Sequence, residues 1–439
     1  MKVLIVAVNK EKYPDPVFPL GASYIAHSAK LAGHEVIIFD ACFEPDVDEK
    51  LKNIILENKP EIIAVSIRNV DNVCFSASEN YLPDYKTIIN ICKKNSTAKI
   101  VMGGSGFSIL PELYMEELKP DYGIKGEGEY AFIELLKNIS ENNVSEQKLI
   151  HSNRIKDINF DTFPKREGFD MDTYYKYSGC INIQTKRGCG FKCSYCTYPL
   201  LEGHSYRFRT STKVVDEIEY WLQSKGINSI FFVDNVFNHP ENYAQKICEE
   251  IIKRNLKITW TGFFIPKIEN PEFLDICKES GLTGIDFGTD AFSNNTLKGF
   301  DKHFTVDDIF RSCELCKEKN IKFNHSIIFG GPNETKLTLE ETVSNLDKTN
   351  PTSLIGFIGI RLYPNTPFVK SINDLDIGLN PTFYISEDIK DIIIDYLQNV
   401  IKTRKNWVIP GLIKESKERH FKRMRQKGIK GPLWEFLEK

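Results

Sequence analysis

Three cysteines stand close together between Arg187 and Cys196, in the run Arg-Gly-Cys-Gly-Phe-Lys-Cys-Ser-Tyr-Cys, which has the spacing C-x-x-x-C-x-x-C. Thiolates are soft ligands that suit iron–sulfur clusters or zinc. Structural zinc takes four ligands, usually in paired groups, whereas this run offers three cysteines and no obvious fourth. The spacing therefore favours a cluster held by Cys189, Cys193 and Cys196, with one iron left open for a cofactor.

The chain carries 11 cysteines, a high count for a sequence without an export signal. Its first apolar run, residues 3–8, is short and no small-residue cleavage site follows it, which indicates a buried strand. We therefore expect a cytoplasmic, reducing location in which clustered cysteines bind metal. Cys313 and Cys316 form another C-x-x-C, but they fall within a helical pattern and have no second pair nearby, so we expect them in the core.

Short apolar runs alternate with helical patterns over residues 1–145, with strands expected at 3–8, 35–39, 62–67 and 99–102. This alternation predicts an α/β fold with a doubly wound, Rossmann-like parallel sheet. Ligands of such sheets bind beyond the carboxyl ends of the strands. The candidate ligand contacts at those ends are Arg68, Asn69, Gly103, Gly104 and Ser105.

A second alternating series follows a polar connector at residues 146–175. Its expected strands lie at 181–185, 229–234, 258–264, 284–288, 323–329 and 354–362. Six strand–helix units predict a partial (β/α)6 barrel over residues 176–370, whose chemistry would sit at the carboxyl ends of the strands. The remaining residues, 371–439, are expected to form a helical, locally basic C-terminal region.

The cysteine spacing, with Tyr195 before the last cysteine, resembles the signature of the radical S-adenosylmethionine (SAM) superfamily. The resemblance implies that the three cysteines hold a 4Fe–4S cluster whose open iron chelates the amino and carboxylate groups of SAM. It also implies that electron transfer to SAM cleaves a carbon–sulfur bond, normally giving a 5′-deoxyadenosyl radical.

Three later segments extend this resemblance. Residues 232–237 resemble the family pattern F-x-D-D-x-F, with Asn235 in place of the second aspartate. Residues 284–291 resemble its glycine- and glutamate-containing strand end, with an aspartate in place of the last glutamate, and residues 361–367 resemble R-x-x-P-G-T-P. The cofactor contacts implied in the barrel are Tyr195, Asp234, Gly288, Asp290 and Arg361. No catalytic residue is assigned.

The N-terminal domain resembles the one that precedes the barrel in cobalamin-dependent radical SAM enzymes. The resemblance is carried by residues 18–26, 33–36, 103–104 and 126–129. It implies that cobalamin lies against the strand ends of this domain. The D-x-H-x-x-G signature of histidine-ligated cobalamin is absent, which removes that mode of ligation but not the cofactor.

These features favour a cobalamin-dependent methyltransferase that acts on an unactivated centre of a small-molecule or peptide substrate. One alternative is a cobalamin-free radical SAM enzyme that performs a rearrangement, an insertion or the transfer of another SAM-derived fragment; another is a cluster-bearing sensor. An electron donor such as a flavodoxin or ferredoxin is implied. The net charge of −3 gives no basic field for nucleic acid, and no apolar stretch reaches the ~20 residues of a membrane span.

Replacing a cluster cysteine should remove the iron. Anaerobically reconstituted protein should bind about four irons and show charge-transfer absorbance, because each cluster is held through thiolates. Cys189→Ala, Cys193→Ala and Cys196→Ala should each abolish both signals, whereas Cys313→Ala should leave them unchanged. A wild-type iron content in any of the three variants would contradict the assignment.

Overall fold

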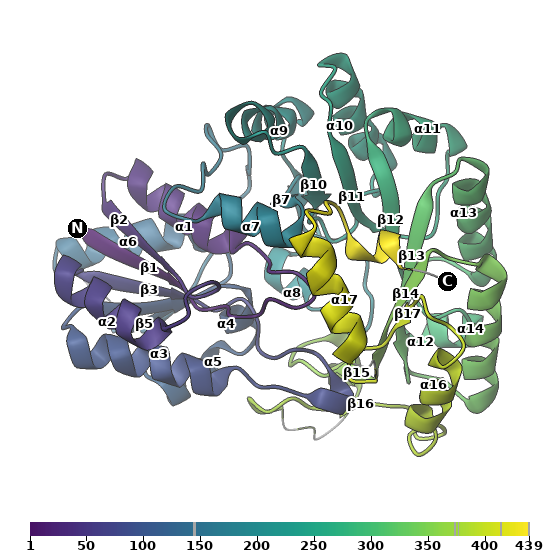
Figure 1. Cartoon of the computed structure of the whole chain (residues 1–439). Helices are drawn as coiled ribbons and strands as arrows, with labels where there is room; N and C mark the ends of the chain where they lie inside the picture. The colour runs from purple at the N-terminus through teal and green to yellow at the C-terminus, as the bar shows by residue number, and fades with distance from the viewer. Residues whose placement is uncertain (144–145, 373–374, 376, 413–414, 438–439) are drawn as a thin grey trace.

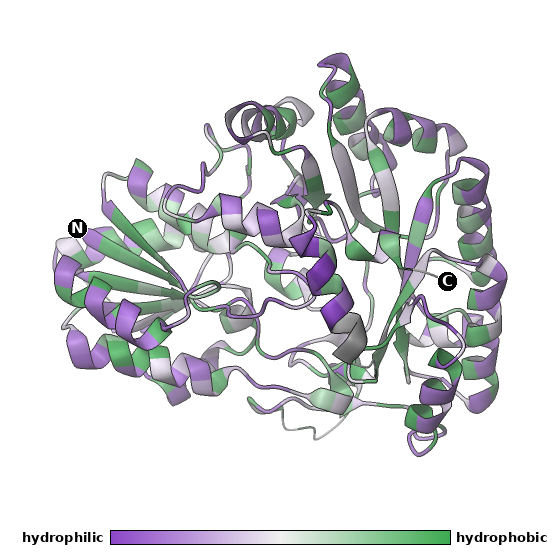
Figure 2. Cartoon of the chain, viewed as in Figure 1, coloured by the Kyte–Doolittle hydropathy of each residue, from purple (hydrophilic) through white to green (hydrophobic). Residues whose placement is uncertain are grey.

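A computed structural model describes residues 1–143, 146–372, 375, 377–412 and 415–437. Figure 1 shows two sheets side by side, each covered by helices, with the N-terminal sheet on the left and the larger sheet on the right. In Figure 2 the strands are largely hydrophobic, whereas the outer helices alternate between hydrophobic and hydrophilic residues. Both domains are therefore built around buried sheets with amphipathic helices outside.

The N-terminal sheet is parallel and has the strand order β2-β1-β3-β4-β5-β6. Its strands are β1 (Lys2–Ala7), β2 (Glu35–Asp40), β3 (Ile62–Ser66), β4 (Lys99–Gly103), β5 (Tyr122–Lys125) and β6 (Leu149–His151). One face is covered by α1 (Leu20–Leu31) and α6 (Gly128–Ser140), the other by α2 (Val47–Asn58), α3 (Leu82–Asn95) and α5 (Pro111–Leu118). The short helix α4 (Ser105–Ile109) follows β4 directly.

The second sheet is also parallel, in the order β17-β14-β13-β12-β11-β10-β7. Its strands are β7 (Ile181–Ile183), β10 (Ser229–Phe232), β11 (Thr259–Phe264), β12 (Leu282–Asp290), β13 (Lys322–Phe329), β14 (Ser353–Ile358) and β17 (Trp407–Val408). The helices between them are α9 (Ser211–Lys225), α10 (Glu241–Lys253), α11 (Pro271–Glu279), α12 (Asn294–Gly299), α13 (Val306–Glu318) and α14 (Lys336–Thr349). This arrangement is an open, partial barrel with its helices outside.

The C-terminal residues pack back onto this sheet. They contain α15 (Pro367–Ser371), α16 (Ile393–Ile401), α17 (Glu415–Gln426) and the 3-10 turn η2 (Leu433–Phe436). Helix α17 contacts α7 (Met171–Ser178), and η2 contacts β13 and β14. Figure 1 shows α17 running across the front of the molecule, between the two sheets.

The predicted fold is confirmed, and all six expected barrel strands are present. The C-terminal region, which is expected to be helical, also contributes a seventh strand to the barrel sheet, β17, and β6 lies within the expected connector. Strand β17 pairs with β14 through only Leu354–Trp407 and Ile355–Val408. A strand of two or three residues is too short to show an alternating pattern, which is why the sequence did not indicate either one.

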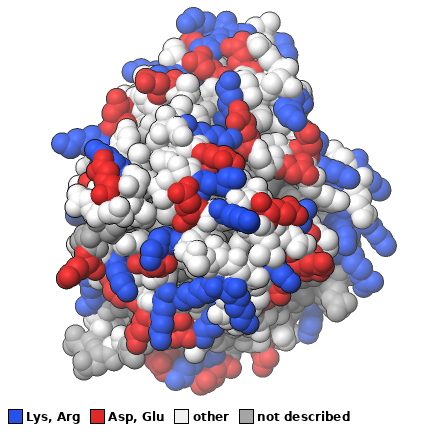
Figure 3. All heavy atoms as spheres, turned by 90° about the vertical axis from the view of Figure 1, so that its left-hand side faces the viewer, with Lys and Arg blue, Asp and Glu red and all other residues white. Residues whose placement is uncertain are grey.

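Surface charge gives no single-sign field on the face shown in Figure 3, where lysines and arginines are interspersed with aspartates and glutamates. Within the described ranges, no helix is long and apolar enough to cross a membrane.

A buried ion cluster fastens the connector to the barrel. Arg166 Nη2 lies 3.4 Å from Glu217 Oε1, and Arg209 Nη1 lies 2.7 Å from Glu217 Oε2. Arg166 also donates to the backbone oxygen of Asn182 at 2.6 Å. Two buried arginines therefore depend on one carboxylate of α9.

Glu217→Gln should lower the free energy of unfolding by about 3 kcal/mol, because it leaves two buried guanidinium groups without a counter-charge. Urea denaturation followed by circular dichroism would measure the change. Glu279→Gln, at an exposed site, is the control and should shift the midpoint little. Equal midpoints for both variants would show that the cluster contributes no net stability.

Candidate active site

The three cluster cysteines lie on one compact loop between β8 (Lys186–Arg187) and α8 (Tyr198–Glu202). Gly188 has a φ of 91°, and a Cβ there would stand 2.2 Å from the backbone oxygen of Ser205, so only glycine fits. The Cys189 N–H donates to the oxygen of Gly203 at 3.0 Å, and the Cys196 N–H donates to that of Cys193 at 3.1 Å. The backbone thus holds the loop at the carboxyl end of the first barrel strand.

The three thiols suit a cluster by their chemistry and surroundings. Burial raises the pKa of Cys196 to about 12, and Cys189 and Cys193 lie near enough to influence it. In the part of the chain that the structure describes, no three His, Cys, Asp or Glu side chains converge as they would around a single metal ion. A 4Fe–4S cluster needs a wider arrangement, because each cysteine binds a different iron.

A buried carboxylate, Asp290, lies beside the cysteine loop at the end of β12. The Tyr195 hydroxyl donates to Asp290 Oδ2 at 2.6 Å, and the Lys302 ammonium forms an ion pair with the same oxygen. Burial opposes the charge of Lys302, but Asp290 and the Cys193 thiol raise its pKa. Tyr195, Asp290 and Lys302 therefore place a hydroxyl, a carboxylate and a cation next to the cluster loop.

Lys302 was not among the residues expected from the sequence. It lies in the loop that follows α12, more than a hundred residues from the cysteines, and belongs to none of the motifs in the sequence. Its side chain is only 7% exposed, so it is held in place by burial and by its ion pair. No local pattern reveals a lysine that becomes important through a long-range contact.

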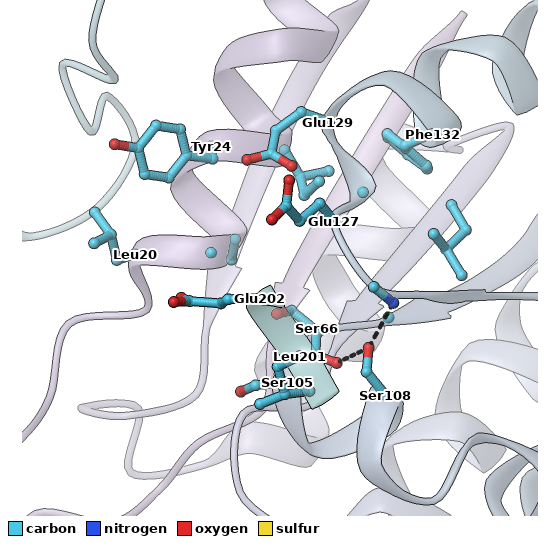
Figure 4. A pocket seen from close by; sticks show the side chains of 18 of the residues that line it. Leu20, Tyr24, Ser66, Ser105, Ser108, Glu127, Glu129, Phe132, Leu201 and Glu202 are labelled. Carbon is cyan, nitrogen blue, oxygen red and sulfur yellow. Dashed lines mark hydrogen bonds between the residues drawn. The ribbon is translucent and has the colours of Figure 1, made fainter. Parts of the chain in front are cut away.

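A cavity of about 320 Å³ opens where the N-terminal strand ends meet the barrel (Figure 4). Its apolar wall comes from the N-terminal domain and includes Ile5, Ala64, Val101, Ile124 and Phe132. Its polar groups come from both domains and include Ser66, Ser105, Ser108, Glu127 and Glu202. Glu202 belongs to α8, directly after the cysteine loop, so the cavity adjoins the cluster site.

Comparisons with known proteins agree with this arrangement. Residues 183–346 match the family described as Radical SAM superfamily, and residues 6–136 match the B12 binding domain. The chain therefore carries a radical SAM domain and a B12 binding domain. The resemblance expected from the cysteine spacing is thereby confirmed, and so is that of the N-terminal domain.

Individual relatives match over most of the chain. A tryptophan 2-C-methyltransferase from Streptomyces laurentii is 23% identical, over 84% of this chain and 74% of the relative. An uncharacterized methyltransferase from Pyrococcus horikoshii is 26% identical, over 83% of this chain and 82% of the relative.

Solved structures show the same fold. The radical SAM methyltransferase TsrM from Kitasatospora setae, solved with tryptophan and a SAM analogue, has a TM-score of 0.89 at 23% identity, covering 99% of this chain and 98% of that one. The cobalamin-dependent SAM radical enzyme OxsB has a TM-score of 0.72 at 16% identity, covering 98% of this chain and 71% of that one.

Asp234 is one of the cofactor contacts that the sequence motifs implied. Both oxygens of its carboxylate already accept hydrogen bonds from the protein. Its Oδ1 accepts from the Thr185 N–H at 2.7 Å, its Oδ2 accepts from the Thr185 hydroxyl at 2.5 Å, and Lys186 Nζ lies 3.6 Å away. This carboxylate positions the segment that leads into the cysteine loop. A direct contact with a cofactor stays a prediction.

Arg361 of β15 (Ile360–Arg361) reaches toward the N-terminal domain. Its Nε donates to Asp71 Oδ2 at 2.7 Å, and its Nη1 donates to the oxygen of Leu362. Its Nη2 is buried and has no hydrogen-bond partner among the described residues. The ion pair joins the last barrel strands to the loop after β3, so Arg361 connects the domains. Its contact with a cofactor stays a prediction.

The predicted contacts at the N-terminal strand ends do come together. Gly104 has a φ of 102°, and a Cβ there would lie 2.4 Å from the oxygen of Ile67, so the turn requires glycine. The Ser105 hydroxyl donates to the oxygen of Arg68 at 2.9 Å, and Arg68 Nη1 donates to Asn69 Oδ1 at 3.0 Å. Gly103, Gly104 and Ser105 line the cavity, whereas Arg68 and Asn69 form its neighbouring loop.

In the barrel, Gly288 lies on the inward face of β12. A Cβ built at this glycine would have no atom closer than 3.9 Å.

Asp290→Asn should weaken SAM binding about tenfold, because it removes the charge of the carboxylate beside the cluster loop while keeping its shape. Equilibrium dialysis with labelled SAM on reconstituted protein would measure the affinity. The iron content should stay at the wild-type level. Asp301→Asn, at an exposed site, is the control, and an unchanged SAM affinity in Asp290→Asn would leave Asp290 with a structural role only.

Proposed function

We propose that the protein is a cobalamin-dependent radical SAM methyltransferase that acts on an unactivated centre of a small-molecule or peptide substrate. The observation that carries the proposal is that the cavity at the N-terminal strand ends adjoins the cysteine loop. Glu202 lines this cavity and accepts a hydrogen bond at 3.0 Å from the Gly188 N–H, next to Cys189. A methyl carrier and a SAM-cleaving cluster could therefore serve one substrate between them.

The cavity suits cobalamin by its chemistry. Its apolar wall between the sheet and α1 matches the aromatic base of the nucleotide tail. The hydroxyl oxygens of Ser66, Ser105 and Ser108 can accept hydrogen bonds from amide groups of the cofactor. Ser108 is held in place, because its hydroxyl donates to the oxygen of Gly104 at 2.8 Å and accepts from the Gly126 N–H at 2.9 Å. The match of residues 6–136 to the B12 binding domain supports the same occupant.

Different residues of the chain would hold the cluster and SAM. Cys189, Cys193 and Cys196 hold the cluster, and Tyr195, Asp290 and Lys302 would bind the polar groups of SAM. When bound, the cluster and SAM supply reductive cleavage and cobalamin supplies the methyl group. The protein orients these groups and keeps water from them.

The activities of two relatives support methyl transfer. They include tryptophan 2-C-methyltransferase and the hopanoid C-3 methylase of Methylococcus capsulatus, which is 24% identical over 69% of this chain. A cobalamin-free enzyme is disfavoured by the B12 binding domain, and a sensor by the SAM-binding set around Asp290.

We also propose a cytoplasmic location and an electron donor such as a flavodoxin or ferredoxin, with no role for nucleic acid. All 11 cysteines are free thiols, which suits a reducing compartment. Reductive cleavage of SAM consumes an electron, which a cluster can supply only after an external donor has reduced it.

Gly103→Leu should lower cobalamin occupancy several-fold, because its side chain would enter the cavity without backbone strain: a Cβ there meets only the Ile124 oxygen, at 3.5 Å. Protein made with cobalamin supplied should carry about one corrinoid per chain, measured by absorbance after extraction. The iron content of the variant should stay unchanged.

Gly378→Leu is the matched control, since a Cβ there meets nothing within 4 Å and the residue lies outside the cavity. Wild-type protein that never binds corrinoid, even on titration, would overturn the cobalamin assignment. Full occupancy in Gly103→Leu would place the cofactor elsewhere.

A further inference from the structure

The inward face of the partial barrel is partly exposed and carries both apolar and polar side chains. Alternate residues on its strands face inward and remain half-buried: Phe231, Phe263, Ser326, Ile355 and Phe357. The residues between them, such as Phe232 and Phe264, are fully buried against the helices. Because inward-facing residues of a closed, filled barrel would be equally buried, these exposures mark an accessible interior.

The far end of the lumen is closed by the C-terminal turn η2. The Trp434 ring lies against Gly284 of β12, where a Cβ would stand 2.6 Å from it. Asp286 lies two residues further along β12, so it forms the next inward-facing layer above this floor. It pairs with Phe263 on one neighbouring strand and with Asn324 on the other.

Asp286 is held in a fixed orientation by neutral donors. Its Oδ1 accepts from Asn324 Nδ2 at 2.9 Å and from the Ser326 hydroxyl at 2.9 Å. Asn324 is itself fixed, because its Oδ1 accepts from the Ser353 hydroxyl at 2.8 Å. Among the described residues, no side chain donates to Asp286 Oδ2 and no Lys, Arg or His pairs with the carboxylate. The side chain is 7% exposed.

A buried carboxylate without a counter-cation is costly. Burial raises the pKa of Asp286 to about 6, although the hydrogen bonds from Asn324 and Ser326 lower it. A cation bound beside this carboxylate would favour its ionised form. The inward face around it presents phenylalanine rings as well as the polar side chains of Asn324 and Ser326. Phe231 and Phe263 meet edge to face, with centroids 5.2 Å apart. Aromatic faces tolerate a neighbouring cation.

We propose that Asp286 binds a cationic nitrogen of the substrate, with the apolar body of the substrate packed against Phe231, Phe263 and Phe357. The substrate class is thus an amine on an apolar or aromatic body. The inference rests on the proposed function, because it places the methyl acceptor in the barrel lumen. Asp286 lies four residues before Asp290 on β12, so the amine would lie deeper in the barrel than the residues that we assign to SAM.

A pair of ligands that differ only in charge tests the proposal. Binding of phenethylamine and phenethyl alcohol to protein loaded with cluster and cobalamin would be measured by equilibrium dialysis. The amine should bind about tenfold more tightly than the alcohol, since a carboxylate favours a cation over a neutral hydroxyl. Asp286→Asn should remove that preference and leave alcohol binding unchanged, because asparagine keeps the oxygen that accepts from Asn324 and Ser326.

Asp307→Asn, an exposed carboxylate on α13, is the matched control and should keep the preference. Equal affinities for the two ligands, binding of neither, or an unchanged preference in Asp286→Asn would each overturn the proposal. Should Asp286→Asn fail to fold, the comparison of the two ligands on wild-type protein decides alone.

Iron and corrinoid content, measured on the same samples, separates the two proposals. Wild-type protein that does not load with cluster and corrinoid counts against the proposed function. Fully loaded protein without a preference for the amine counts against the role of Asp286.

Discussion

A buried set of ion pairs between the two domains holds the cysteine loop against the cavity at the N-terminal strand ends. Arg187, the residue before Gly188, donates to Glu129 Oε1 at 2.6 Å and lies 3.5 Å from Glu127 Oε2. Arg207 meets the same Glu127 at 2.5 Å. Both glutamates lie where β5 leads into α6. The ion pairs therefore join the carboxyl end of an N-terminal strand to the segment that directly precedes the cysteine loop.

This set of ion pairs also determines the character of the cavity. Two glutamates face it, and unpaired they would repel the polar groups and phosphate of a nucleotide tail. Paired with Arg187 and Arg207, they are close to neutral as a group, and burial of all four side chains strengthens the attraction. The Asp71–Arg361 pair ties the domains at a second place. The spacing between the cofactor sites therefore depends on charge pairing as well as on packing.

Sequence patterns were sufficient for the features that depend on neighbours along the chain. The cysteine spacing indicated the cluster, and alternating apolar runs indicated both parallel sheets, because these signals come from local chemistry and periodicity. Lys302, the Arg187–Glu129 pair and β17 were missed, because each depends on a partner far away in the sequence. Asp234 and Arg361 were recognised by motif, but only their geometry showed that protein groups already occupy them.

The carboxylates around the two cofactor sites differ in one respect that points to the substrate. Asp234 has Lys186, Asp290 has Lys302, and Glu129 has Arg187, so each of these buried charges is compensated within the protein. Asp286 is equally buried yet has only Asn324 and Ser326, which orient it without neutralising it. Glu202 also lacks an ion pair, but its Oε2 accepts from the Gly188 N–H at 3.0 Å and from Asn235 Nδ2 at 3.1 Å, so its hydrogen bonds hold the cysteine loop. Asp286 instead keeps one oxygen to which no described side chain donates, on the inward face of the barrel, where a bound cation would pair with it.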